Sequence, residues 1–230
     1  MAGPIPLNQA PKADLRKIKA VFFDIDDTFS SSDSSRGFRE SRILPEAFKA
    51  LWDLHRAGIK TVPVTGRPAG WCDMIARMWP VSAIVGENGA FYSYVEAARA
   101  DGDAAKGDAS DVPSRLVKRY FEPAGVRKRN AALLARLHDE IRREFGGAKV
   151  PSDQPFREFD LAIDYCEDVR RWPQARVQRL MEFARDRGAM AKLSSIHVNI
   201  WFGRYDKWTC VKKAMKDLFG IDPKSGLDRV

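Results

Sequence analysis

Residues 20–28 read AVFFDIDDT, an apolar run that ends in a group of aspartates. The run Ala20–Phe23 follows a basic segment, and this pattern is typical of a strand buried in the middle of a sheet. Asp24, Asp26 and Asp27 come directly after it. Open α/β sheets bind their ligands at the carboxyl ends of their strands. We therefore predict that these carboxylates lie at a binding site on that edge.

The next segments predict a loop, a helix and a second strand. The polar residues 28–42 are typical of a loop. A helix follows, because Pro45 suits its first turn and Gly58 suits the position just past its end. IKTVPVTG, residues 59–66, predicts the second strand, although Pro63 lacks a donor for the sheet.

A second helix and a third strand complete the pattern. GWCDMIARM (residues 70–78) predicts a short helix, and VSAIV (residues 81–85) predicts a strand that ends in GENGA. Strands and helices that alternate at short spacing indicate βαβ units and a parallel sheet. Right-handed crossovers bring the strand ends to one edge. We expect convergence there of Asp24, Thr65, Glu87 and Asn88.

The pattern changes after Gly89, where helices and candidate antiparallel strands predict an inserted α+β domain. Strands are expected at 90–95, 156–166, 191–195 and 196–202, helices at 124–145, 173–187 and 206–219, a mobile loop at 97–112, and the start of another strand at 227–230. We expect a flexible leader at residues 1–18, a core from 19–90 and 201–230, and the inserted domain at 91–200.

Asp24 and Asp26 are the strongest chemical signal. A carboxylate can act as a nucleophile and form an aspartyl-phosphate. A second carboxylate can give a proton to a leaving oxygen and later take one from water. Acids crowded at a strand end repel one another unless a cation balances them, and Mg²⁺ prefers such oxygen ligands. An acidic loop that caps a helix is the structural alternative.

Three further residues suit phosphate binding. The hydroxyl of Thr65 can donate to a phosphate oxygen, and Gly66 beside it allows close backbone approach. Arg67 can bind a phosphate or a sugar hydroxyl. Lys207 opens a predicted helix, whose positive end favours an anion.

The order of these motifs resembles the haloacid-dehalogenase (HAD) superfamily, and within it the Cof-like and sucrose-phosphate-phosphatase-like group. The resemblance consists of DxDxT after the first strand, TGR after the second, ENGA after the third, a long insert and a late DK that opens a helix. It covers nearly the whole chain from Ala20. It implies an α/β fold, a Rossmann-like core with a parallel sheet, and an α+β cap inserted after the third strand.

The resemblance also implies roles for individual residues. Asp24 is expected to be the nucleophile and a Mg²⁺ ligand. Asp26 is expected to be the general acid and base and to offer the metal its backbone carbonyl. Thr65 and Lys207 are expected to bind the phosphoryl group. Contacts with the leaving group are expected from Arg67, Glu87 and Asn88.

The implied activity is Mg²⁺-dependent hydrolysis of a small phosphorylated metabolite, such as a sugar or polyol phosphate. The family carries a fourth motif, GDxxND, whose acids complete its metal site. This sequence reaches GLDRV at residues 226–230 and has no later acid. We therefore expect these residues alone to bind Mg²⁺ weakly and to turn over slowly, compared with a chain extended past Val230.

Composition limits the partners. The net charge of +8 favours anionic ligands, but no zinc-finger spacing or aromatic RNA-binding strand accompanies it, so nucleic acid is not expected as a partner. No run of about 18 apolar residues predicts a membrane span. The scattered cysteines, Cys72, Cys166 and Cys210, fit a reducing, cytoplasmic compartment. An exposed sheet edge would favour association into a homo-oligomer.

Several alternatives stay open. The chain can be a phosphate-binding pseudoenzyme, an inactive truncated fragment, or a phosphomutase that returns the phosphoryl group to product. A response-regulator receiver fits less well, because its phosphorylated aspartate follows the third strand, where this chain has GENGA. A phosphatase for nucleic acid is disfavoured by the large insert.

Overall fold

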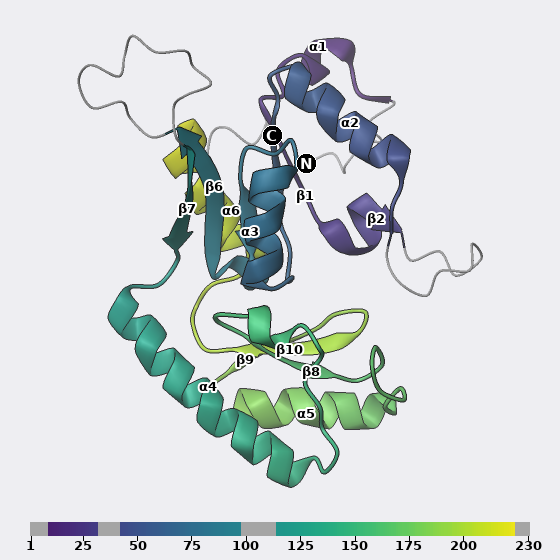
Figure 1. Ribbon diagram of the computed structural model, residues 1–230, viewed down its shortest axis with the longest axis vertical. Helices are drawn as coiled ribbons and strands as arrows, with labels where there is room; N and C mark the ends of the chain where they lie inside the picture. Colours follow the sequence, from purple (N-terminus) through teal and green to yellow (C-terminus); the bar gives the residue numbers. More distant parts are fainter. Residues whose placement is uncertain (1–8, 32–41, 98–113, 224–230) are drawn as a thin grey trace.

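The computed structural model describes residues 9–31, 42–97 and 114–223. The chain forms two units (Figure 1). The core unit contains the first and the last residues that the structure describes. The inserted unit, residues 124–201, leaves the core after β7 (Ser114–Tyr120) and returns to it before α6 (Lys207–Phe219).

A parallel sheet forms the centre of the core unit, as the sequence predicts. β1 (Ala20–Phe23) pairs with β4 (Lys60–Pro63) in parallel, from Ala20 opposite Lys60 to Phe23 opposite Pro63. A parallel bridge between Val64 and Val85 joins β4 to β5 (Ile84–Gly86). Pro63 is tolerated because it is the last residue of its strand.

Two antiparallel strands extend this sheet beyond β5. β6 (Phe91–Ala97) pairs with β5, and β7 pairs with β6. The sequence analysis placed residues from 91 onward in the inserted domain, whereas their pairing joins 91–97 and 114–120 to the core sheet. The reason is local: residues 87–89 have φ angles of 41°, 57° and 104°, which reverse the chain directly after β5.

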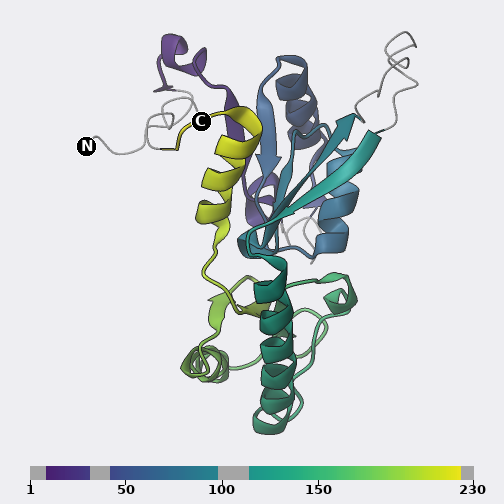
Figure 2. The same cartoon turned by 90° about the vertical axis from the view of Figure 1, so that its left-hand side faces the viewer.

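Helices cover both faces of the core sheet (Figure 2). α3 (Ala69–Met78) buries Cys72 and Ile75 in a cluster with Ile84 and Phe91. α6 buries residues of its inner face against the other side of the sheet. α2 (Pro45–Arg56) begins at the expected proline and buries Leu51. The core unit is therefore a three-layer α/β structure.

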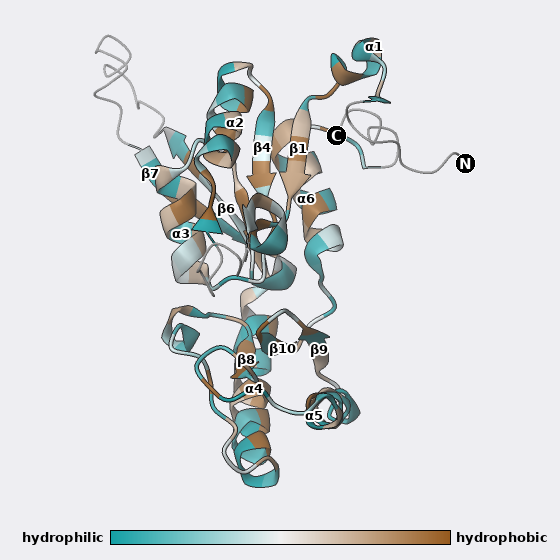
Figure 3. Cartoon of the chain, turned by 90° about the vertical axis from the view of Figure 1, so that its right-hand side faces the viewer, coloured by the Kyte–Doolittle hydropathy of each residue, from teal (hydrophilic) through white to brown (hydrophobic). Residues whose placement is uncertain are grey.

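The inserted unit is a sheet with helices on one face. α4 (Ala124–Glu144) and α5 (Gln174–Asp186) pack on an antiparallel sheet in the order β8-β10-β9. Its strands are β8 (Leu161–Asp164), β9 (Met190–Leu193) and β10 (His197–Trp201). Figure 3 shows this sheet between the two helices and the core unit. Its free face therefore looks toward the carboxyl ends of β1 and β4.

Smaller elements complete the described chain. They are α1 (Lys12–Leu15), the irregular turn η2 (Ile25–Phe29), β2 (Ser30–Ser31), β3 (Arg42–Ile43), and the single turns η4 (Glu87–Gly89) and η7 (Gln154–Phe156). The expected leader thus contains one short helix. Most of the expected loop at 97–112 and the expected strand at 227–230 lie outside the described residues. In the part of the chain that the structure describes, no helix has the length and apolar character needed to cross a membrane.

Candidate active site

A cleft of about 300 Å³ separates the core unit from the free face of the inserted sheet. The core side contributes Asp24, Asp26, Asp27, Gly66, Arg67, Asn88 and Lys207. The inserted side contributes Arg157, residues 192–197 and Asn199. The cleft thus lies at the strand ends where the sequence predicts a binding site.

Asp24 and Lys207 face each other on the core side. Asp24 follows the last residue of β1, and its Oδ1 accepts a hydrogen bond of 2.8 Å from the N–H of Ile25. Its Oδ2 lies 2.5 Å from Lys207 Nζ. Lys207 is the first residue of α6, which Asp206 caps through the N–H of Thr209. Lys207 therefore places a positive charge against the Asp24 carboxylate.

Asp26 is held by Arg67 at two points. Arg67 Nη2 lies 2.6 Å from Asp26 Oδ1, and Arg67 Nε lies 3.1 Å from Asp26 Oδ2. The guanidinium also lies over the ring of Trp71, 4.8 Å from its centroid. The structure brings Arg67 to the cleft as predicted, but its guanidinium binds the Asp26 carboxylate. In this arrangement it fixes the orientation of the Asp26 side chain.

Thr65 lies behind the wall of the cleft. Its side chain is fully buried, and its Oγ1 accepts a hydrogen bond of 3.0 Å from the N–H of Arg67. The backbone of Thr65 also binds Val85 and Asn88. The structure therefore gives Thr65 a role in shaping the turn that presents Arg67, which differs from the expected contact with the phosphoryl group.

Glu87 lies where the core meets the inserted unit, as expected, but it is not among the residues that line the cleft, so its contact with substrate stays a prediction. It is fully buried, and its carboxylate accepts four backbone N–H bonds, from Ala69, Glu158, Phe159 and Asp160. Burial and the nearby Asp160 raise the pKa of Glu87 to about 8, while the N–H groups act in the opposite direction. Glu87 joins the start of α3 to the inserted unit.

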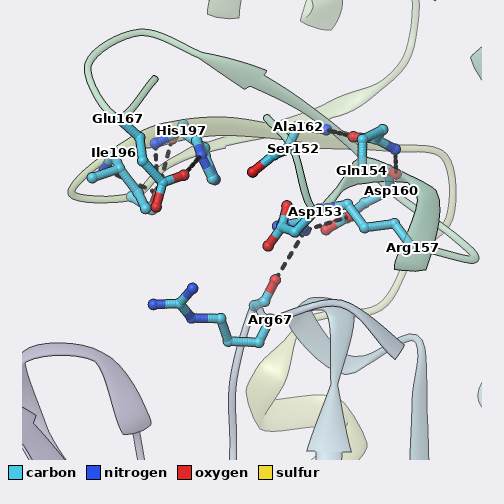
Figure 4. Close-up of polar contacts among 12 residues, drawn as sticks. Arg67, Ser152, Asp153, Gln154, Arg157, Asp160, Ala162, Glu167, Ile196 and His197 are labelled. Carbon is cyan, nitrogen blue, oxygen red and sulfur yellow. Dashed lines mark hydrogen bonds and ion pairs between the residues drawn. The ribbon is translucent and has the colours of Figure 1, made fainter. Parts of the chain in front are cut away.

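Asn88 does line the cleft, and it leads through Asp160 to Arg157, for which the sequence predicted no role. Its Nδ2 donates to Asp160 Oδ2 at 3.2 Å. Asp160 Oδ1 in turn accepts from Arg157 Nη1 at 2.8 Å, and the same nitrogen donates to the Gly66 carbonyl at 3.0 Å. Figure 4 shows Arg157 beside Asp153 and Asp160, above Arg67. Residues 157–160 thus lie outside the strand expected at 156–166, which the structure limits to Leu161–Asp164.

The inserted sheet places Lys192, His197 and Asn199 on the cleft. The sequence did not single out any of these three as site residues. Strand alternation alone could not find them, because it does not say which face of a sheet covers a site. The needed signal is the register, in which Asn199 lies opposite Lys192.

Oxygen donors for a metal ion are present but few. Asp24 and Asp26 offer carboxylates at the end of β1, and each carboxylate is bound by a cation. Among residues 9–31, 42–97 and 114–223, no three His, Cys, Asp or Glu side chains form a group able to hold a metal ion. Mg²⁺ is commonly held by one or two carboxylates together with waters and substrate phosphate, so this donor set fits Mg²⁺ only as part of its shell.

Comparison with known proteins rests on structure. No protein-family model matches the chain, and no curated protein matches its sequence. A solved haloacid-dehalogenase-like hydrolase from B. subtilis superposes with a TM-score of 0.51 and 14% identity, over 87% of this chain and 79% of that chain. The chain has the fold of the HAD superfamily. This agrees with the order of motifs in its sequence.

Two further solved structures share this HAD fold. The Thermoplasma acidophilum protein 0175 has a TM-score of 0.59 and 14% identity, over 89% of this chain and 73% of that chain. The C-terminal domain of C. albicans trehalose-6-phosphate phosphatase has a TM-score of 0.58 and 11% identity, over 95% of this chain and 69% of that chain. At these identities the likeness concerns the HAD fold alone.

Proposed function

We propose that the protein is a Mg²⁺-dependent phosphatase that hydrolyses a small phosphorylated metabolite through an aspartyl-phosphate on Asp24. One observation carries the proposal. At the end of β1, Asp24 and Asp26 face a cleft, and each is held by a cation from a distant part of the chain, Lys207 and Arg67 respectively. The HAD fold and the phosphatase named among the structural neighbours support it.

In the first step an oxygen of Asp24 attacks phosphorus. A new bond forms between that oxygen and phosphorus, and the bond from phosphorus to the leaving oxygen breaks. Asp26 gives its proton to the leaving oxygen, which departs as an alcohol. Lys207 stabilises the charge that develops on the phosphoryl oxygens.

In the second step water attacks the aspartyl-phosphate. Asp26 takes a proton from the water while the water oxygen forms a bond to phosphorus. The bond between phosphorus and the Asp24 oxygen breaks. Inorganic phosphate leaves, and both carboxylates return to their starting state. Arg67 holds the Asp26 side chain in place for this step.

Mg²⁺ would be held by the Asp24 carboxylate and the Asp26 carbonyl, with the substrate phosphate. When bound, the ion supplies positive charge that reduces repulsion between the anionic substrate and the carboxylates. To bind the ion, the Asp24 carboxylate must give up part of its contact with Lys207. The inserted unit acts as a cap that limits the cleft to small substrates and shields it from water.

The test is phosphate release from p-nitrophenyl phosphate and a panel of sugar and polyol phosphates, with Mg²⁺ or with EDTA. We expect Mg²⁺-dependent release that Asp24→Asn abolishes and that the control Asp53→Asn leaves unchanged, since Asp53 is an exposed helix residue. Phosphate binding without release would instead favour a binding protein. Return of the phosphoryl group to product would indicate a phosphomutase.

A further inference from the structure

The wall of the cleft that faces Asp24 is built from β9 and β10. Val198 and Ile200 point into the hydrophobic core beneath this sheet, against α4 and α5. The alternate residues His197 and Asn199 therefore point toward the cleft. Lys192 lies directly opposite Asn199 in the antiparallel register, so it shares this face.

Lys192 differs from the other cations of the cleft. Lys207 is paired with Asp24, and Arg67 is paired with Asp26. Arg157 is paired with Asp160 at 2.8 Å. Lys192 has neither an ion pair nor a side-chain hydrogen bond with any residue that the structure describes. It is the side chain on this wall whose positive charge is not balanced by a direct contact within the described chain.

Asn199 is a second, independent sign of a ligand. It is 6% exposed, and its Oδ1 is buried with no hydrogen-bond partner among the residues that the structure describes. Its amide nitrogen lies on the Gly66 side of the cleft. Buried amides are almost always hydrogen-bonded, so an amide left unpaired beside a cleft is suited to a bound molecule. Because amide oxygen and nitrogen can exchange places by rotation, either atom can serve.

His197 completes this wall. Its Nε2 lies 2.7 Å from Glu167 Oε2, which fixes the plane of the ring (Figure 4). The ring is 3% exposed and borders the cleft. Lys192, His197 and Asn199 thus form one polar patch, here called the roof patch, on the side of the cleft away from Asp24. A cleft of about 300 Å³ has room for a small molecule between them.

We infer that the leaving group of the substrate carries a second anionic group, a carboxylate or a second phosphoryl group, and that the roof patch binds it through Lys192. The inference rests on the proposed function and names its substrate class. Arg67 and Lys207 lie at the end of the cleft where the phosphoryl group would react. Lys192 is exposed on the opposite wall of the cleft, and its positive charge favours a second negative charge over a neutral sugar ring.

Matched substrate pairs test this inference. In the first pair, 3-phosphoglycerate has a carboxylate where glycerol 3-phosphate has a hydroxymethyl group. In the second pair, fructose 1,6-bisphosphate has a second phosphoryl group that fructose 6-phosphate lacks. We expect kcat/KM at least about 10-fold higher for the anionic member of one pair, since hydrogen bonds to charged groups are the stronger ones. The pair that shows it identifies the anion.

Lys192→Met should remove this preference by raising KM for the anionic substrate, with kcat/KM for its neutral partner within about 2-fold of the parent value. Lys216→Met, an exposed lysine at the last turn of α6, is the matched control and should keep the preference. Equal losses on both members would overturn the inference and place Lys192 at the phosphoryl group. Turnover of p-nitrophenyl phosphate with no preference in either pair would overturn this inference alone. No release from any substrate would overturn the proposed function as well.

Discussion

Asp24 and Lys207 are separated by 183 positions in the sequence and by 2.5 Å in the structure. The contact depends on the fold, because Asp24 ends β1 and Lys207 begins α6. It is partly exposed, so its contribution to stability is small. Under the proposed function its importance is for chemistry, where the fixed positive charge of Lys207 acts on a developing negative charge.

Lys207→Met should lower kcat for p-nitrophenyl phosphate by about 10²–10³-fold, the usual cost of removing a charge-stabilising donor. The thermal midpoint should change little. Lys213→Met, on the same helix and paired with Asp217, is the control and should retain full activity. A kcat that stays within about 2-fold after Lys207→Met would contradict this role.

Asp26→Asn should lower kcat by about 10²–10⁴-fold for sugar phosphates, because the leaving alcohol then lacks a proton donor. The loss should be smaller for p-nitrophenyl phosphate, whose leaving group needs no proton. Both substrates are measured with the same enzyme preparation, so each serves as the control for the amount of active enzyme. Equal losses on both would show that the loss arises in what the two substrates share, which is hydrolysis of the aspartyl-phosphate, metal binding or the structure itself, and would contradict proton donation to the leaving group as the limiting role of Asp26.

At the scale of elements, the turn at residues 87–89 connects three parts of the molecule. It reverses the chain between β5 and β6, and Glu87 anchors α3 and the inserted unit through four N–H bonds. Gly89 adopts φ 104°, and a Cβ there would lie 2.2 Å from the carbonyl oxygen of Asp206. The same turn therefore sets the start of α6 and the position of Lys207.

Gly89→Ala should both destabilise the chain and lower kcat, because the added methyl displaces the start of α6. Gly147→Ala is a matched control, since Gly147 also has a positive φ of 77° but has open space around its Cβ position. The control should lose stability without loss of kcat in the folded protein. Equal kcat in the two variants at a temperature where both are folded would disprove this coupling.

The raised pKa of Glu87, about 8, predicts a pH dependence of stability. The ordinary value is 4.5, so between these values the folded chain keeps a proton that the unfolded chain has lost. The contribution of Glu87 to the free energy of unfolding is therefore fully present below about pH 4.5 and is lost as the pH rises through about 8. Denaturant unfolding at several pH values in this window should show stability falling as pH rises.

Glu87→Gln should flatten that dependence. The substitution should also lower the free energy of unfolding by about 1–3 kcal/mol for each N–H left without an acceptor, because the amide NH₂ cannot accept a hydrogen bond. Glu46→Gln, at an exposed position in the first turn of α2, is the control and should behave as the parent. A variant with parent stability would show that Glu87 does not join the two units.

At the scale of the whole molecule, the sequence predicted the α/β core and the acids at the end of β1. Those signals are local, since an apolar run followed by Asp24 and Asp26 indicates a strand and its functional end. The sequence did not predict that β6 and β7 join the core sheet, because alternation marks a strand without naming its partner. It also missed the buried role of Glu87 and the roof patch, which depend on contacts between distant segments.

The most direct test of the aspartyl-phosphate is its chemical capture. The enzyme is mixed with substrate and Mg²⁺, quenched in acid within the first turnover, digested, and examined by mass spectrometry. We predict one phosphoryl group on the peptide that contains Asp24, and none in the Asp24→Asn variant. Turnover that continues in that variant, or a phosphoryl group found on another residue, would contradict Asp24 as the nucleophile.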